Sequence, residues 1–185
     1  MNDLAIFLDG VTKHFGSVHA LRGVNFDVQR GETFGFLGPN GAGKTTAIRV
    51  LTGFISADAG TARVLGLDAA RESVEIKRHL GFLPDTISFG GGLTGQAFLD
   101  HIARLHGFRG APPLQREVLD RLELSTSALQ RGVKGYSTGM GKKLALVQAM
   151  QHDPELLILD EPTESLDPLI RQQLFALSRD LQKRG

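Results

Sequence analysis

Residues 38–45 read GPNGAGKT and fit the phosphate-binding pattern GxxxxGK[ST] at every fixed position. The glycines let the backbone curl so that its N–H groups point inward at phosphate oxygens. Lys44 adds a positive charge for the β- and γ-phosphates, and the Thr45 hydroxyl is a hard oxygen ligand for Mg²⁺. The alternative is a glycine-rich turn that binds nothing. That alternative does not explain why Lys and Thr follow the glycines, because neither residue is needed there for packing. The pattern predicts that the chain binds a nucleoside triphosphate.

A second group able to do chemistry is the sequence LLILDE at residues 156–161. A continuous apolar run of this length is typical of a parallel strand buried on both faces. Such a strand carries Asp160 to the carboxyl edge of the sheet, where it can reach the shell of a phosphate-bound Mg²⁺. Glu161 follows and can act as general base on an attacking water. The alternative is a pair of acidic residues that cap a following helix with Pro162 at its start.

The elements around the phosphate-binding pattern are a predicted strand and helix. Residues 33–37, TFGFL, predict a short buried strand, and residues 46–51 predict the start of a helix with Ile48 and Leu51 on one face. The amino end of that helix adds partial positive charge at the phosphate site. Upstream, residues 4–28 predict antiparallel strands, because Val24, Phe26 and Val28 alternate with polar residues.

The rest of the chain alternates between short strands and helices. Residues 30–32 predict a turn, and residues 61–65 and 81–84 predict strands, the second ending at a proline. Helical spacing follows in four segments, with apolar faces formed by Phe98, Ile102 and Leu105, by Leu114, Val118 and Leu122, by residues 142–150, and by Ile170, Leu174, Leu177 and Leu181.

Composition excludes several classes of function. The 185 residues include no cysteine, which rules out disulfides, thiolate metal sites and a cysteine nucleophile. The net charge is +1 and no run of basic residues exceeds two, so nothing suggests a nucleic-acid surface and no nucleic-acid partner is expected. No apolar stretch approaches the length of a membrane span. Any membrane role is therefore expected to come through a partner.

In this order and spacing, the motifs resemble those of the ATP-binding cassette (ABC) family over essentially the whole length. Phe15 lies where the family places an aromatic residue that stacks on adenine, although a core phenylalanine is the alternative. The resemblance implies that ATP is bound by Phe15, Gly38, Pro39, Asn40, Gly41, Ala42, Gly43, Lys44, Thr45 and Thr46. It also implies a Mg²⁺ ion held by Thr45 and Asp160.

The segment before residue 142 resembles the family signature and is similar to the variant in bacterial ABC-2-type and multidrug exporter ATPases. The signature residues are Ser137, Thr138, Gly139, Met140 and Gly141. By the resemblance they contact the γ-phosphate bound to a second subunit, whereas an ordinary loop before a helix is the alternative. The residues Ser165, Leu166 and Asp167 match the family's D-loop, which crosses the dimer interface. The resemblance implies a homodimer of cassettes that encloses two ATP molecules.

The implied fold is α/β, a P-loop NTPase core with a parallel sheet, an N-terminal antiparallel β subdomain and an inserted α-helical subdomain. We expect a single domain over residues 1–185, in which 1–85 and 145–185 form the core with the β subdomain and 86–144 form the helical subdomain.

Two departures from the family pattern stand out. Asp85 replaces the usual glutamine, so it is either a further metal ligand or a turn residue. The family's last core strand, which ends in a histidine that contacts the γ-phosphate, has no match, and the six histidines all lie upstream of its place as surface or filler residues. The chain thus resembles a cassette truncated before that histidine, and we expect weak or no hydrolysis from these residues alone.

The leading hypothesis is the ATPase subunit of an exporter, in which separate membrane permease subunits choose a substrate that this sequence does not reveal. It would lie in the cytoplasm, peripherally on the inner face of the plasma membrane. One alternative is a soluble ABC ATPase of repair or translation. Another is a regulatory or vestigial cassette that binds ATP without turnover.

Overall fold

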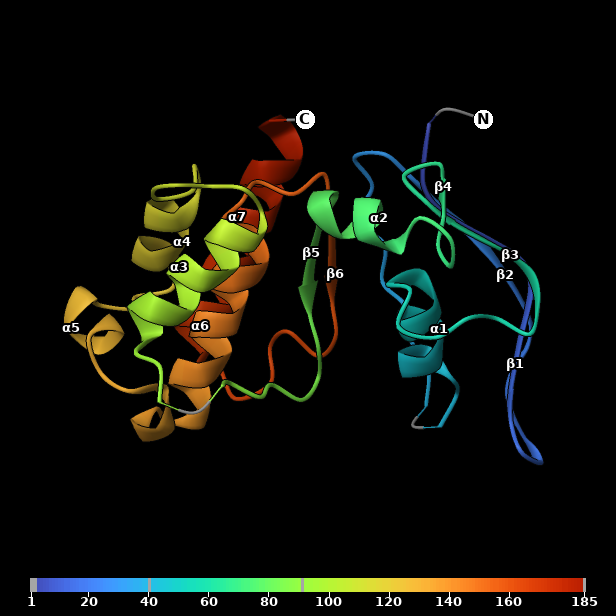
Figure 1. Cartoon of the computed structure of the whole chain (residues 1–185), viewed down its shortest axis with the longest axis horizontal. Helices are drawn as coiled ribbons and strands as arrows, with labels where there is room; N and C mark the ends of the chain where they lie inside the picture. The colour runs from blue at the N-terminus through green and yellow to red at the C-terminus, as the bar shows by residue number, and fades with distance from the viewer. Residues whose placement is uncertain (1–2, 40, 91, 185) are drawn as a thin grey trace. The chain divides into compact units, whose positions relative to one another are not determined.

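The computed structural model describes residues 3–39, 41–90 and 92–184, and the chain divides into two compact units, Met1–His79 and Leu80–Gly185. The α/β class is confirmed, since the first unit contains an antiparallel sheet with helices and the second contains a parallel strand pair with helices (Figure 1). No helix within the described residues is long and apolar enough to cross a membrane.

The first unit is built on a four-stranded antiparallel sheet in the order β2-β1-β3-β4. Its strands are β1 (Leu4–Phe15), β2 (Val18–Gln29), β3 (Ala59–Val64) and β4 (Leu67–Asp68). β1 and β2 form a hairpin whose pairing runs from Leu4↔Gln29 to Phe15↔Val18 at its tip. The antiparallel strands expected over residues 4–28 are confirmed, and so is the alternation along β2, where Val28 is buried and Asn25, Asp27 and Gln29 are exposed.

Two helices complete this unit, α1 (Lys44–Leu51) and α2 (Ser73–His79). Ile48 and Leu51 are buried on one side of α1, as its spacing predicts. The predicted buried strand at residues 33–37 is wrong: the segment has no strand pairing, and Phe34 and Leu37 are 43% and 90% exposed. A strand needs a neighbour for its backbone hydrogen bonds, and this segment pairs with no described strand; the Phe34 ring instead stacks on Phe26 of β2 at a centroid distance of 5.3 Å.

The second unit contains β5 (Leu80–Leu83) and β6 (Leu156–Leu159), which pair in parallel from Leu80↔Leu156 to Leu83↔Leu159. Ile158 is buried, whereas the rest of β6 is only half-buried rather than covered on both faces as expected. The helical elements are α3 (Gly95–Leu105), α4 (Gln115–Arg121), α5 (Thr126–Leu129), the 3₁₀ turn η1 (Val133–Gly135), α6 (Thr138–Met150) and α7 (Pro168–Arg184), with α6 packed against β5 (Figure 1).

The predicted apolar faces of the helices are confirmed except on α3. The residues Leu114, Val118 and Leu122 are all buried around α4, and α7 buries Ile170, Leu174 and Leu177. On α3 the face turned to the core is instead Gly95, Leu99 and Ala103, whereas Leu105 is 69% exposed. Small residues at Gly95 and Ala103 allow close packing, and Gly95 lies directly against the Tyr136 hydroxyl.

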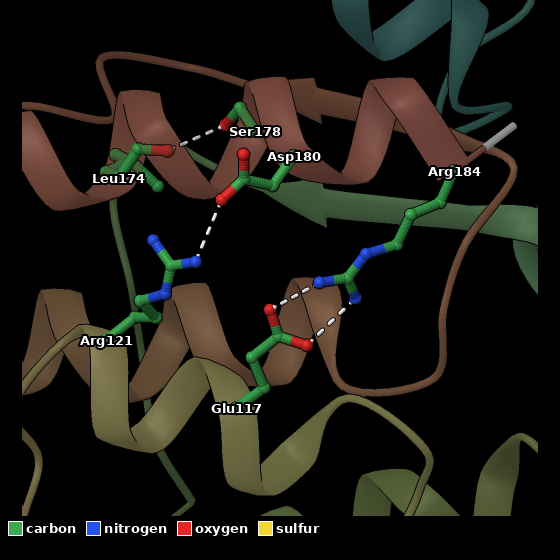
Figure 2. Close-up of polar contacts among 6 residues, drawn as sticks. All are labelled: Glu117, Arg121, Leu174, Ser178, Asp180 and Arg184. Carbon is green, nitrogen blue, oxygen red and sulfur yellow. Dashed lines mark hydrogen bonds and ion pairs between the residues drawn. The ribbon is translucent and has the colours of Figure 1, made fainter.

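Two ion pairs join α4 to α7 across the surface of the second unit (Figure 2). The Arg184 guanidinium donates to both carboxylate oxygens of Glu117 at 2.9 and 2.8 Å, and Arg121 donates to Asp180 at 2.8 Å. Beneath these pairs the buried faces of the helices hold α7 against α4.

Candidate functional site

The phosphate-binding segment leads directly into helix α1. Gly41 and Gly43 have φ values of 80° and 90°, a left-handed conformation that favours glycine. The Lys44 amine donates to the carbonyl oxygens of Gly38 and Pro39 at 2.7 and 3.0 Å, so the loop curls around its own lysine. Gly43 is the N-cap of α1 and brings no side-chain cap, and the first turn carries no acidic residue. This end of the helix therefore keeps its positive partial charge for an anion.

A close contact ties the loop to the β1–β2 hairpin. A Cβ atom on Gly43 would overlap the carbonyl oxygen of Ala20 and come within 2.9 Å of Leu21 Cδ2, so only glycine fits. Ala20 lies on β2 two residues from Val18, which pairs with Phe15 at the hairpin tip. Two residues of a strand span about 7 Å. The first unit thus brings the phosphate loop and the aromatic residue Phe15 close together.

The Phe15 ring is available for stacking. It is 49% exposed at the end of β1, so the alternative of a core phenylalanine is wrong. The Lys13 amine lies 5.8 Å from the centroid of the ring. An exposed ring beside a phosphate-binding loop can take the flat face of a base, because stacking requires no particular hydrogen-bond pattern.

In the second unit the acidic residues follow the ends of two paired strands. Asp160 comes directly after β6 and Asp85 two residues after β5, so parallel pairing brings both to one edge of the strand pair. The backbone N–H of Asp160 donates to the Leu83 carbonyl oxygen at 2.9 Å, and Asp160 is only 9% exposed. Asp85 and Glu161 are exposed. A carboxylate set here can accept a metal or a water proton from solvent.

The turn after Asp160 is conformationally strained. Glu161 and Ser165 have φ values of 48° and 60°, which are uncommon for residues with a Cβ and cluster at functional sites. The next helix, α7, begins only at Pro168, and the carboxylate of Asp167 caps it by accepting from the Ile170 N–H at 3.0 Å. The alternative that Asp160 and Glu161 cap a helix starting at Pro162 is therefore wrong.

The signature segment forms the start of α6. The Ser137 hydroxyl accepts from the Met140 N–H at 3.2 Å, so the helix begins at Thr138, four residues before its predicted start. Gly139 lies close to the turn after β6, since a Cβ there would be 3.0 Å from the Ser165 carbonyl oxygen. The second unit thus brings the signature and the D-loop side by side, and the amino end of α6 is held in place by its cap.

The predicted site residues are divided between the two units. The first holds Phe15, Gly38, Pro39 and the residues from Gly41 to Thr46; the second holds Asp85, the signature, Asp160, Glu161 and Asp167. Asn40 lies outside the described residues. No group of three or more histidine, aspartate or glutamate side chains in the described parts of the chain could hold a metal. Few protein ligands are what a Mg²⁺ site needs when substrate phosphates supply the others, and the exposed Thr45 hydroxyl in the first unit and the Asp160 carboxylate in the second are each a suitable oxygen ligand for that ion.

One polar residue of this region was missed by the sequence reasoning. The Asp58 carboxylate accepts from the Lys13 amine at 2.7 Å and from the His14 backbone N–H at 2.6 Å, both next to Phe15. These partners are 44 and 45 residues away along the chain, and no local pattern around Asp58 points to them. Only the pairing of β1 with β3 brings them together.

Comparisons with known proteins identify the family of this chain. A family model described as "ABC transporter" matches residues 21–164. The daunorubicin resistance ATP-binding protein DrrA3 of Streptomyces coeruleorubidus is 39% identical over 183 residues, which cover 98% of this chain and 58% of that protein. The probable multidrug ABC transporter ATP-binding protein YbhF of Escherichia coli is 36% identical over 180 residues, covering 95% of this chain and 30% of that protein. The chain thus spans less than two thirds of each relative.

Solved structures share the fold. The structure described as an ATP-binding subunit of an ABC transporter has a TM-score of 0.88 at 26% identity, covering 98% of this chain and 76% of that one. The bacterial ABC transporter cassette MJ0796, solved as a dimer, has a TM-score of 0.87 at 23% identity, covering 97% and 83%. The expected cassette fold, with its N-terminal antiparallel sheet and helical portion, is confirmed.

Proposed function

Because this chain belongs to the ABC transporter family, we propose that it is the ATP-binding and hydrolysing subunit of an exporter and works with separate membrane permease subunits. Two of its relatives carry daunorubicin resistance and multidrug transport in their names, which supports export rather than uptake. Such a subunit acts in the cytoplasm, peripherally on the inner face of the plasma membrane.

The observation that carries the proposal is the phosphate loop. Its lysine is held by two loop carbonyl oxygens, and its helix end is left without a side-chain cap. The loop amides, Lys44, Thr45 and Thr46 receive the triphosphate, and the exposed Phe15 ring receives the adenine. An uncapped helix end with a lysine beside it attracts a phosphate through its N–H groups and its positive charge.

For turnover we assign the acidic residues after β6. Asp160 and Thr45 would hold Mg²⁺, which when bound neutralises charge on the phosphates. Glu161 is exposed and in a strained turn, and as general base it takes the proton of the attacking water. Asp85 is exposed at the neighbouring strand end and is a further candidate for the metal.

The catalytic unit is proposed to be a homodimer. A twofold contact presents the same surface from both copies, so each signature can serve the ATP of its partner. Ser137, Thr138, Gly139, Met140 and Gly141 would contact the γ-phosphate held by the other subunit, and Asp167 would lie at the interface. The Ser137 hydroxyl already accepts one hydrogen bond as a helix cap and still has a donor for a phosphate oxygen.

We also retain the proposed division of one cassette domain into a core with the β subdomain, at residues 1–85 and 145–185, and a helical subdomain at 86–144. Its support is the insertion of α3, α4 and α5 between β5 and β6, the two paired strands.

The test is ATP-dependent dimerisation of the Glu161→Gln variant, measured by analytical ultracentrifugation with MgATP. Without its base, the subunit should bind ATP and accumulate as a dimer, and any phosphate release by the unmodified chain should be lost. Lys44→Ala should stay monomeric, because ATP binding itself is weakened.

The matched control is Glu164→Gln, an exposed glutamate in the same turn. It should behave as the unmodified chain does. Dimers that form equally in Lys44→Ala, or phosphate release that continues in Glu161→Gln, would contradict the assignment. ATP binding without release by this chain and also by a version extended through the family's last core strand would favour the regulatory cassette.

A further inference from the structure

Asp58 is the residue that holds the tip of the β1–β2 hairpin from outside the hairpin. Its carboxylate makes three contacts with two consecutive residues of β1: the Lys13 amine at 2.7 Å, the His14 N–H at 2.6 Å and His14 Nδ1 at 3.1 Å. Its own backbone N–H donates to the Thr12 carbonyl oxygen at 2.9 Å. Asp58 therefore forms hydrogen bonds with β1 at Thr12 and at His14, on both sides of Lys13.

The Asp58 contacts begin where the hydrogen-bond ladder between β1 and β3 ends. The last residue pair of that ladder is Thr12↔Ala59, and Asp58 lies just before β3. In an antiparallel ladder, hydrogen bonds to one neighbour recur at every second residue. His14 is the next residue of β1 in that series after Thr12, and its N–H is satisfied by the Asp58 carboxylate instead of by a strand.

We call the contacts of Asp58 with Thr12, Lys13 and His14 the Asp58 clamp. Phe15 is the next residue along β1. It ends β1, pairs with Val18, and is followed by Gly16 at a φ of 58° in the turn. The tip is open to solvent, with Phe15 49% and Val18 62% exposed. The same Lys13 amine that pairs with Asp58 also lies 5.8 Å from the Phe15 ring centroid. Alternate residues of a strand share a face, so Lys13 reaches the ring from one side and sets its position.

We propose that Asp58 is a positioning residue for nucleotide binding: it fixes the end of β1 and Lys13, and through them holds the Phe15 ring ready to stack on the base. This rests on the proposed function, in which Phe15 receives the adenine. Asp58 touches neither base nor phosphate in this role. Its effect is confined to ligands that carry a base.

The Asp58 carboxylate keeps the negative charge that this positioning role requires. Hydrogen bonds from the Lys13 amine and the His14 N–H lower the pKa of the Asp58 carboxyl to about 2, so it remains ionised at physiological pH. An ionised carboxylate can hold the ammonium group and the backbone donor together, whereas an amide in its place keeps an acceptor and loses the ion pair.

The experiment compares two ligands in the full chain, MgATP and magnesium tripolyphosphate, which has no base. Asp58→Ala should weaken ATP binding roughly three- to tenfold, because a base–aromatic stack contributes on the order of tenfold or more to binding. Tripolyphosphate binding should stay within about twofold, since the phosphate loop does not depend on the stack. Asp58→Asn should weaken ATP binding by an intermediate amount. If Asp58→Ala fails to fold, the same comparison of ligands is made with Asp58→Asn.

A double-mutant cycle with Phe15→Ala tests whether Asp58 affects ATP binding through the Phe15 ring. Phe15→Ala should weaken ATP binding about tenfold, and adding Asp58→Ala should then change little, because the ring that it positions is gone. The matched control is Asp9→Asn, an exposed carboxylate on the same strand, which should leave both affinities unchanged.

Equal losses for both ligands in Asp58→Ala, or a full further loss in the Phe15→Ala background, would overturn the inference and leave the proposed function standing. Failure of the unmodified chain to bind either ligand would overturn the proposed function and the inference with it.

Discussion

His152 is expected to make the stability of the fold sensitive to mild acid. It lies just beyond the carboxyl end of α6, is 7% exposed, and stacks on His106 at a ring-centroid distance of 3.8 Å. Burial, with the neighbouring His106 imidazole adding to it, lowers the pKa of His152 from 6.5 to about 4. Between these values the unfolded chain binds a proton that the folded chain does not. Stability therefore falls as the pH drops from about 6.5 towards 4.

The size of the effect follows from these two pKa values. For such an imidazole, lowering the pH from about 7 to about 5 costs roughly 1.8 kcal/mol of unfolding free energy. The variant His152→Phe keeps a ring against His106 and has no proton to bind, so its loss between the two pH values should be smaller by that amount.

Urea unfolding followed by circular dichroism at both pH values measures the difference. Subtracting the variant from the unmodified chain removes the titration of the carboxylates, which the two share. His101→Asn, an exposed histidine on α3, serves as control and should retain the full pH dependence. If His152→Phe lost as much stability on acidification as the unmodified chain, the assigned pKa and its cause would be refuted.

Two further changes test the packing around the site and between the helices. Gly43→Ala should cost about 2–3 kcal/mol and weaken ATP binding at least roughly tenfold, because the new Cβ meets the Ala20 carbonyl oxygen and the φ of 90° disfavours a side chain; thermal melts and an ATP titration check this, and unmodified values for both would contradict it. Arg184→Ala should cost about 0.5–1 kcal/mol at low salt and less at high salt, since its pair with Glu117 is partly exposed. A double-mutant cycle with Glu117→Gln measures that coupling, and a coupling above about 2 kcal/mol would show that exposure does not limit it.

The sequence predicts the elements whose patterns are local. Alternation along β2 and the helical spacing of Leu114, Val118 and Leu122 each recur within a few residues, and burial follows them. The phosphate loop is equally local, since its glycines and Lys44 are consecutive. In such segments the residues that determine the structure are neighbours in the chain, so their pattern can be recognised in the sequence.

The sequence does not predict features that depend on which surface a segment meets. On α3 the bulky residues Phe98, Ile102 and Leu105 suggest the buried face, but Phe98 and Ile102 are only half-buried and Leu105 is exposed. The buried face is centred on Leu99, with the small residues Gly95 and Ala103 on either side of it. Residues 33–37 are apolar enough for a strand but lack a described partner for pairing, and Phe34 instead stacks on Phe26 at 5.3 Å. The Asp58 clamp depends on strand pairing across more than 40 residues.

Hydrogen exchange with and without ligand tests the central claim most directly, namely that the phosphate loop of the first unit receives the phosphates and its hairpin tip receives the base. MgATP should slow amide exchange in residues 38–46 and at the hairpin tip, residues 13–18, whereas magnesium tripolyphosphate should slow it in residues 38–46 alone. Protection by ATP that is absent from both segments, or that lies only in the second unit, would contradict the account.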